Sequence, residues 1–172
     1  MNTVEETIAI AVPVRTAYNQ WTQFRSFPRF MSVVKKVEQV RPNMTHWVLG
    51  FGPVRHEFAA EIVEQQPDMG LAWRGLDRRF SHRGEVSFRP SASGVTLVTV
   101  RIQIQGRGVA DLVAQRSGVT RRVVRSELGH FKEFIEGLGE AGGAWRGVIR
   151  NGRVQQMEPE PPRCQVPQWP VG

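Results

Sequence analysis

Histidine is the side chain best suited to acid–base chemistry near neutral pH, and the sequence holds four: His46, His56, His82 and His130. No two of them have metal-ligand spacing on one element, and zinc-cluster cysteine spacings are absent, so we expect neither a metal nor another cofactor. His56 is the main candidate, because strand alternation places it on one face with Phe58. It is either a general acid–base group or a structural histidine bonded to a carbonyl group or water.

Motifs of other activities do not occur in the sequence. There is no G-x-S-x-G, P-loop, H-E-x-x-H or G-x-G-x-x-G pattern. Arg74 and Arg101 have the charge to hold a carboxylate or enolate, but alternation turns both to the face opposite His56. The catalytic residues therefore stay unassigned, with His56 as the one candidate.

Length and composition indicate one domain followed by a tail. The chain has 172 residues, of which 40% are hydrophobic, which is enough for a sizeable core. No apolar run approaches the roughly 18–20 residues of a membrane span, and no signal-peptide pattern opens the chain, so we expect a cytoplasmic protein. The net charge of +7 has two interpretations: a solvated basic face, or a surface that attracts nucleic acid or the ribosome.

One long amphipathic helix is predicted over Val119–Leu138. Its apolar residues recur at steps of three and four, which places them on one side: Val124, Leu128, Phe131, Ile135 and Leu138. Thr120 is its expected N-cap and Gly139 its expected stop. Twenty helical residues span about 30 Å, so the apolar side needs a broad partner.

Most of the chain before this helix predicts strands. A strand over residues 4–12 precedes a helix that begins at Pro13 and a short helix capped by Ser26. Alternating apolar residues and short turns then predict six antiparallel strands: Val33–Val40, Thr45–Phe51, Val54–Gln66, Leu71–Gly75, Ser81–Arg89 and Thr96–Ile104. A short joining helix is expected over residues 109–115.

The order strand, two helices, six strands and long helix resembles the helix-grip fold. The stretches that carry the resemblance are Val12–Met31, His46–Val48, Ala59–Arg74 and Gly129–Gly139. They are similar to the polyketide cyclase/dehydrase-like branch of the START-related superfamily (SRPBCC, Bet v-like), in an actinobacterial type. The resemblance implies an α+β fold in which a curved antiparallel sheet of about seven strands wraps the long C-terminal helix.

The resemblance covers roughly residues 3–149, and Gly143–Gly147 resembles a C-terminal extension found in those relatives. We expect a helix-grip domain over residues 1–140. Residues 141–172 are expected to form a Gly/Pro-rich extension that is partly disordered. Trp145 and Trp169 are the residues of the extension expected to dock on the domain or on another subunit.

A curved sheet that closes on a straight helix leaves a cavity, which by default is a small-molecule site. The alternative is a core filled by its own large rings. The expected ligand-binding residues are Trp47, Phe51, His56, Phe58, Ala60, Trp73, Phe88, Val100 and Ile102 from the strands, and Phe131, Phe134 and Ile135 from the helix.

Two functions follow from the sequence, because one fold hosts many activities. The first is binding of a hydrophobic small molecule (an aromatic polyketide, a quinone or a lipid), with or without cyclase/dehydrase turnover. The second is a non-enzymatic interaction module that meets RNA, the ribosome or a protein through its basic surface. The first function requires an open cavity with a polar group. The second requires a contiguous basic face and no cavity. Monomer and homodimer both stay open.

Overall fold

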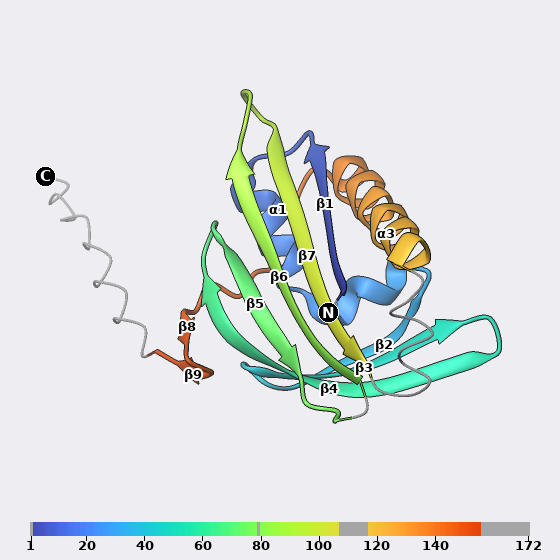
Figure 1. The fold of residues 1–172 in the computed structure, drawn as a ribbon. Coiled ribbons are helices and arrows are strands. Elements are labelled where there is room, and N and C mark those ends of the chain that lie inside the picture. The colour runs from blue at the N-terminus through green and yellow to red at the C-terminus, as the bar shows by residue number, and fades with distance from the viewer. Residues whose placement is uncertain (1, 79, 107–116, 156–172) are drawn as a thin grey trace, which may run out of the picture.

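The computed structural model describes residues 2–78, 80–106 and 117–155. Seven strands form one antiparallel sheet in the order β1-β7-β6-β5-β4-β3-β2, and the short strands β8 and β9 continue it beside β4. Figure 1 shows that this sheet is strongly curved, with α1 behind it and α3 beside β1. The helix-grip architecture predicted from the sequence is confirmed.

The elements follow the expected order closely. Their bounds are β1 Asn2–Ile10, α1 Val14–Trp21, the 3-10 helix η1 Phe24–Arg29, β2 Val34–Arg41, β3 Met44–Phe51, β4 Val54–Gln66, β5 Gly70–Gly75, β6 Phe80–Pro90, β7 Thr96–Gly106, α3 Ser117–Leu138, β8 Ile149–Arg150 and β9 Arg153–Val154. The helix expected over residues 109–115 lies outside the described residues. No helix in the described part of the chain is long and apolar enough to cross a membrane.

The long helix is confirmed, but two details of its ends were wrong. Thr120 lies inside α3 rather than at its cap, because the helix already includes Ser117. Leu138 is 51% exposed, because the last turn has passed the apolar surface that Ile135 still contacts. Gly139 ends the helix as predicted: its φ is +71°, and its N–H donates to the Ile135 carbonyl at 2.9 Å.

The predicted cap of the short second helix was also wrong. That segment is the 3-10 helix η1, which begins at Phe24 and has Gln23 in the cap position. The Ser26 hydroxyl donates to the Gln23 carbonyl, so it closes the turn from inside the helix. Pro28 lies within η1, one residue before the end of this short helix.

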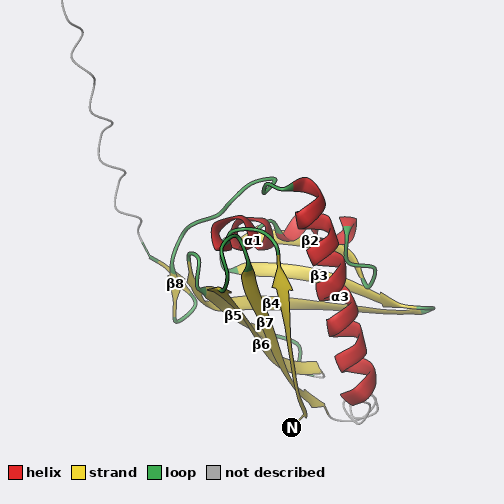
Figure 2. Ribbon diagram, turned by 90° about the horizontal axis from the view of Figure 1, so that it is seen from above, coloured by secondary structure: helices red, strands yellow, loops and turns green. Residues whose placement is uncertain are grey.

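The helices α1 and α3 bury their apolar sides against the same face of the sheet, as the two views of Figures 1 and 2 show. We call this the inner face. The largest fully buried side chains include Tyr18 of α1, Phe131 and Ile135 of α3, and Ile10 of β1. The core therefore joins the two helices to the sheet.

Residues 139–155 form a strap that returns across α1. The Gly142 N–H donates to the Gln20 side chain at 2.8 Å, and the Trp145 N–H donates to the Thr22 hydroxyl at 3.0 Å. Trp145 is half-buried and packs against the core, so it docks on the domain as expected. Trp169 lies outside the described residues.

The strap is fixed by Arg146. Its guanidinium donates to both carboxylate oxygens of Asp68 at 2.8 and 2.9 Å and to the Asn19 side chain at 2.7 Å. It also lies over the Tyr18 ring, 5.7 Å from its centroid. These bonds hold the pKa of Asp68 below its usual value. One side chain thereby joins the strap, α1 and the β4–β5 turn.

Candidate functional site

Large rings fill the part of the interior next to α1. Trp21 meets Phe131 edge-to-face at 5.1 Å and Phe88 at 6.0 Å, and Tyr18 meets Phe88 at 5.6 Å. All four rings are 5% exposed or less. Four predicted lining residues belong to this buried core: Phe88, Val100, Phe131 and Ile135. In this half of the interior, the large rings fill the space between helix and sheet, as the alternative of a filled core predicted.

The other half of the inner face is reached by solvent. Trp47, His56, Trp73 and Ile102 all lie at inward positions and are only half-buried. Phe58 and Ala60 lie among them on β4 and are buried. These six residues come from the predicted lining, and the structure places them on the same face of β3, β4, β5 and β7. The side chain of Phe51 lies outside the described residues.

Two glycines let aromatic rings lie flat against the sheet here. Trp73 pairs with Gly84 across β5 and β6, and a Cβ at Gly84 would lie 2.1 Å from the indole ring. A Cβ at Gly75 would likewise lie 2.4 Å from the imidazole of His82. Neither ring has room to lie so close to the sheet unless its neighbour is glycine. The two rings therefore form a floor along the inner face instead of projecting across the interior.

A row of rings continues this floor. The planes of Trp47 and Phe58 differ by 5°, with centroids 6.4 Å apart. Phe58 lies between two imidazoles: His56 stacks on it at 5.8 Å, and His82 meets it edge-on at 4.8 Å. The two imidazoles thus add ring nitrogen atoms to the aromatic floor beside Phe58.

His82, which is only 6% exposed, was not among the predicted site residues. The signal was present in the alternation, since His82 has the same parity on β6 as the inward residues Gly84 and Val86. His46, by contrast, lies on the outer side of β3, where its Nε2 is 3.9 Å from a carboxylate oxygen of Glu57.

A second polar cluster lies along α3, and the sequence did not indicate it. Glu127 is 7% exposed, and its Oε1 accepts a 2.7 Å hydrogen bond from the Ser32 hydroxyl. The Nδ1 of His130 is 3.5 Å from the same oxygen. Phe134, a predicted lining residue, lies on the same helix, and its ring packs at 4.6 Å on Phe30, the residue that follows η1.

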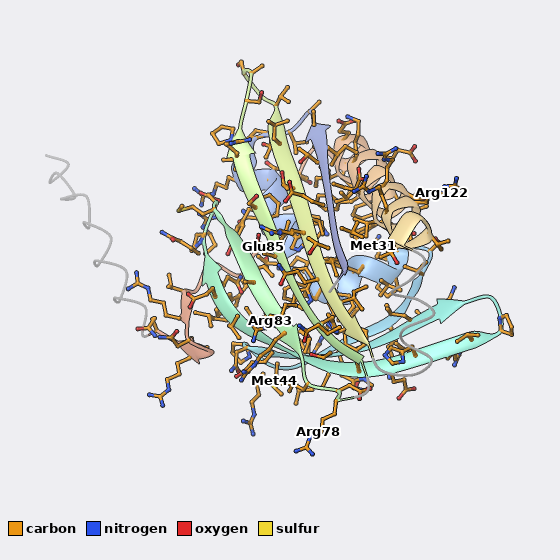
Figure 3. The ribbon with its side chains drawn as sticks, viewed as in Figure 1. Met31, Met44, Arg78, Arg83, Glu85 and Arg122 are labelled. Carbon is orange, nitrogen blue, oxygen red and sulfur yellow. The ribbon has the colours of Figure 1, made fainter. Side chains whose placement is uncertain are left out.

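The outer face of the sheet carries charged side chains, as expected for Arg74 and Arg101. A groove of about 350 Å³ lies there, and its lining includes Arg74, Arg83, Glu85 and Arg101. Figure 3 shows Arg83 and Glu85 on this face of β6. Arg74 pairs with Glu61 at 2.6 Å, and Arg101 lies 3.9 Å from each of two carboxylates. Acidic groups thus interrupt the arginines.

No group of three or more potential metal ligands occurs among the described residues. The described groups on the inner face and along α3 include aromatic rings, imidazoles and the carboxylate of Glu127. Such groups bind a ligand by stacking and hydrogen bonding, and they can transfer protons.

Solved structures show which class of protein this fold defines. An aromatase/cyclase from Streptomyces sp. R1128 has a TM-score of 0.71 and 13% identity, over 83% of this chain and 98% of that chain. A START superfamily protein from Mycobacterium smegmatis has a TM-score of 0.66 and 14% identity, over 78% and 99%. Identities this low show the fold alone, which is the START-like helix-grip fold.

Sequence comparison identifies the family. Residues 10–133 match the family described as polyketide cyclase/dehydrase and lipid transport. An uncharacterized 17.2 kDa protein of Streptomyces lincolnensis is 41% identical over 149 residues, which cover 87% of this chain and 99% of that protein. The chain belongs to the polyketide cyclase/dehydrase and lipid transport family.

Proposed function

We propose that this protein binds a flat, hydrophobic small molecule between the inner face of its sheet and α3. The observation that carries the proposal is the floor of rings, in which Trp73 and His82 lie flat over glycines while Trp47 and His56 stay half-buried. Aromatic surface that solvent reaches on an inward face is stabilised when a ring system covers it and displaces water. Family membership supports the same function.

Aromatic polyketides and quinones fit this floor better than a fatty acid does. Parallel rings such as Trp47 and Phe58 stack with a fused ring system, whereas an alkyl chain gains only apolar contact. The half-buried imidazole of His56, which stacks on Phe58, lies where it would meet a ketone or hydroxyl group of such a ligand. We therefore expect a ligand of a few fused rings with oxygen substituents.

Two modes of action use this site. In a carrier, the ligand is bound and released unchanged. In a cyclase, His56 would take a proton from the carbon next to a ketone and so promote an aldol-type ring closure followed by loss of water. The two modes differ in whether the ligand is altered, so mass spectrometry of a polyketone substrate before and after incubation distinguishes them.

Tryptophan fluorescence tests binding directly, because Trp47 and Trp73 belong to the floor of rings on which we expect the ligand to lie. Titration with an aromatic polyketide, a quinone and a fatty acid should give saturable quenching for at least one class. Binding no tighter than about 100 μM for every class would contradict the proposal. A Kd of that size corresponds to a binding free energy of only about 5–6 kcal/mol. Native mass spectrometry of protein from its own host would identify any ligand that is carried along.

A matched pair of variants locates the site. Ala60 lies on the inner side of β4 and is 1% exposed, whereas its neighbour Ala59 has the opposite parity. Ala60→Trp should remove the quenching, and Ala59→Trp should retain it, provided that circular dichroism shows both to be folded. Equal binding by the two variants would place the ligand elsewhere. Trp47→Leu removes a stacking ring without adding volume and serves as the second variant.

The interaction-module alternative has less support from the described residues. It requires a contiguous basic face, but the outer-face arginines alternate with Glu5, Glu61 and Glu85. Such an arrangement forms ion pairs within the protein rather than a uniform positive surface for a phosphate backbone. The inner face is therefore the better candidate.

A further inference from the structure

We propose that Glu127 recognises a hydroxyl group of the ligand, so that the ligand class is a phenol- or enol-bearing ring system. This inference rests on the binding function proposed above. Glu127 is 7% exposed, and its Oε2 is buried without a hydrogen bond from any described residue. A buried carboxylate oxygen is a strong acceptor, and leaving it without a donor is costly.

The position of Glu127 on α3 points its side chain toward the interior. It follows Val124 by three residues and precedes Phe131 by four, and residues at these spacings share one side of a helix. Phe131 is fully buried, and the half-buried Val124 packs against the core. The carboxylate therefore lies at the edge of the same apolar side that covers the sheet.

One oxygen of this carboxylate is already fixed. Oε1 accepts the bond from Ser32, which lies between η1 and β2, so the side chain is held between α3 and that segment. Figure 3 shows Met31, the residue before Ser32, beside α3. Fixing one oxygen orients the other, and a carboxylate oriented in advance binds a ligand without losing further rotational freedom.

The described cations of α3 do not reach Oε2. Lys132 donates to the Ala9 carbonyl and contacts Glu136, on the side of the helix that faces β1. Arg125 donates to Glu6 of the same strand, and Arg121 Nε lies 3.5 Å from an oxygen of that carboxylate. Arg122 points away from the sheet in Figure 3. A ligand donor is thus the partner that this oxygen lacks.

The chemistry of a carboxylate acceptor defines which ligands it selects. An ionised carboxylate has no proton to donate, so it accepts from a phenol, an enol or an amine and repels a ketone or ether oxygen. The buried Nδ1 of His130 also has no hydrogen bond from a described residue, and it lies beside the same carboxylate. An imidazole there can donate to the oxygen of the same hydroxyl group, which serves as both donor and acceptor.

The test uses two probes of equal shape, 1-naphthol and 1-methylnaphthalene, in fluorescence titrations with the full chain. Hydrophobic transfer alone favours the methyl compound, because its substituent is apolar. We expect the wild-type protein to bind 1-naphthol at least about tenfold tighter, as a site with an unpaired acceptor does. Glu127→Met should lose this preference, and Glu127→Gln should weaken it. Glu133→Gln, an exposed change on the same helix, should keep it.

Each outcome decides a different claim. If the wild-type protein binds both probes equally or prefers 1-methylnaphthalene, this inference is overturned while the proposed function stands. If neither probe nor any ligand class binds, the proposed function fails and the inference fails with it. If Glu127→Met keeps the preference, another residue holds the hydroxyl and the inference is overturned. Glu127→Gln decides the matter if Glu127→Met does not fold.

Discussion

Replacing Arg146 should detach the strap from the domain. Arg146→Ala removes the two bonds to Asp68, the bond to Asn19 and the contact with the Tyr18 ring. The side chains of Arg146 and Asp68 are 30% and 35% exposed, so the pair lies between a surface ion pair and a buried one. Surface pairs contribute about 0–1 kcal/mol, and breaking a buried pair costs about 3–5 kcal/mol.

We therefore expect Arg146→Ala to lower the free energy of unfolding by about 2–3 kcal/mol. In a domain of this size that corresponds to a decrease in Tm of roughly 5–10 °C. Arg146→Lys should lose more than half of this energy, because an ammonium group keeps the charge but not the two parallel bonds. Arg150→Ala, an exposed change in the same strap, should stay within about 0.5 kcal/mol of the wild type.

Urea unfolding at several pH values tests the cause as well as the size of this effect. The folded-state pKa of Asp68 is lowered, chiefly by its hydrogen bond from Arg146. The pair therefore stabilises the protein above the unfolded-state pKa of about 4, and this contribution is lost as the pH falls through the folded-state value. The difference in the free energy of unfolding between the wild type and Arg146→Ala should therefore shrink as the pH falls below about 4. Equal stability of the two proteins at pH 7 would refute the role given to Arg146.

Three further predictions concern the core, the floor of rings and the end of α3. Phe131→Ala should cost about 3–5 kcal/mol in urea unfolding, because its ring is fully buried, whereas Glu133→Ala should cost no more than about 0.5. Gly84→Ala should push Trp73 off the sheet, which shifts tryptophan emission and weakens ligand binding with a loss of about 1–3 kcal/mol in stability. Gly139→Ala should cost about 1 kcal/mol by the same assay, because its φ of +71° strains any other residue.

The sheet could be predicted from the sequence because its strands alternate cleanly. Residues such as His56, Phe58 and Ala60 carry a period of two that no helix shares, and β4 matches its predicted bounds. The ends of α3 were harder, because a cap depends on where the preceding chain enters the helix. The burial of Leu138 depends on where the opposing surface ends, which its spacing does not reveal.

The candidate site was predicted only in part, because alternation gives the face of a residue and not its packing. Trp73 and Phe88 have the same inward parity, yet one is half-buried over a glycine and the other belongs to the filled core. The burial of Glu127 was not predicted, since a charged residue is seldom buried. Its burial follows from the Ser32 hydroxyl, which lies far away in the sequence.

The uneven filling of the interior separates stability from binding. Rings that meet edge-to-face around Trp21 and Phe131 bury nearly all their surface and make this half rigid. Their stabilisation offsets the cost of leaving half-buried rings on the inner face and an unpaired carboxylate oxygen on α3. Changes around Phe131 should therefore lower stability first, whereas changes at Trp73 or Glu127 should alter ligand affinity in a protein that still folds. A single set of variants, measured by both urea unfolding and fluorescence titration, would show whether the two halves are independent.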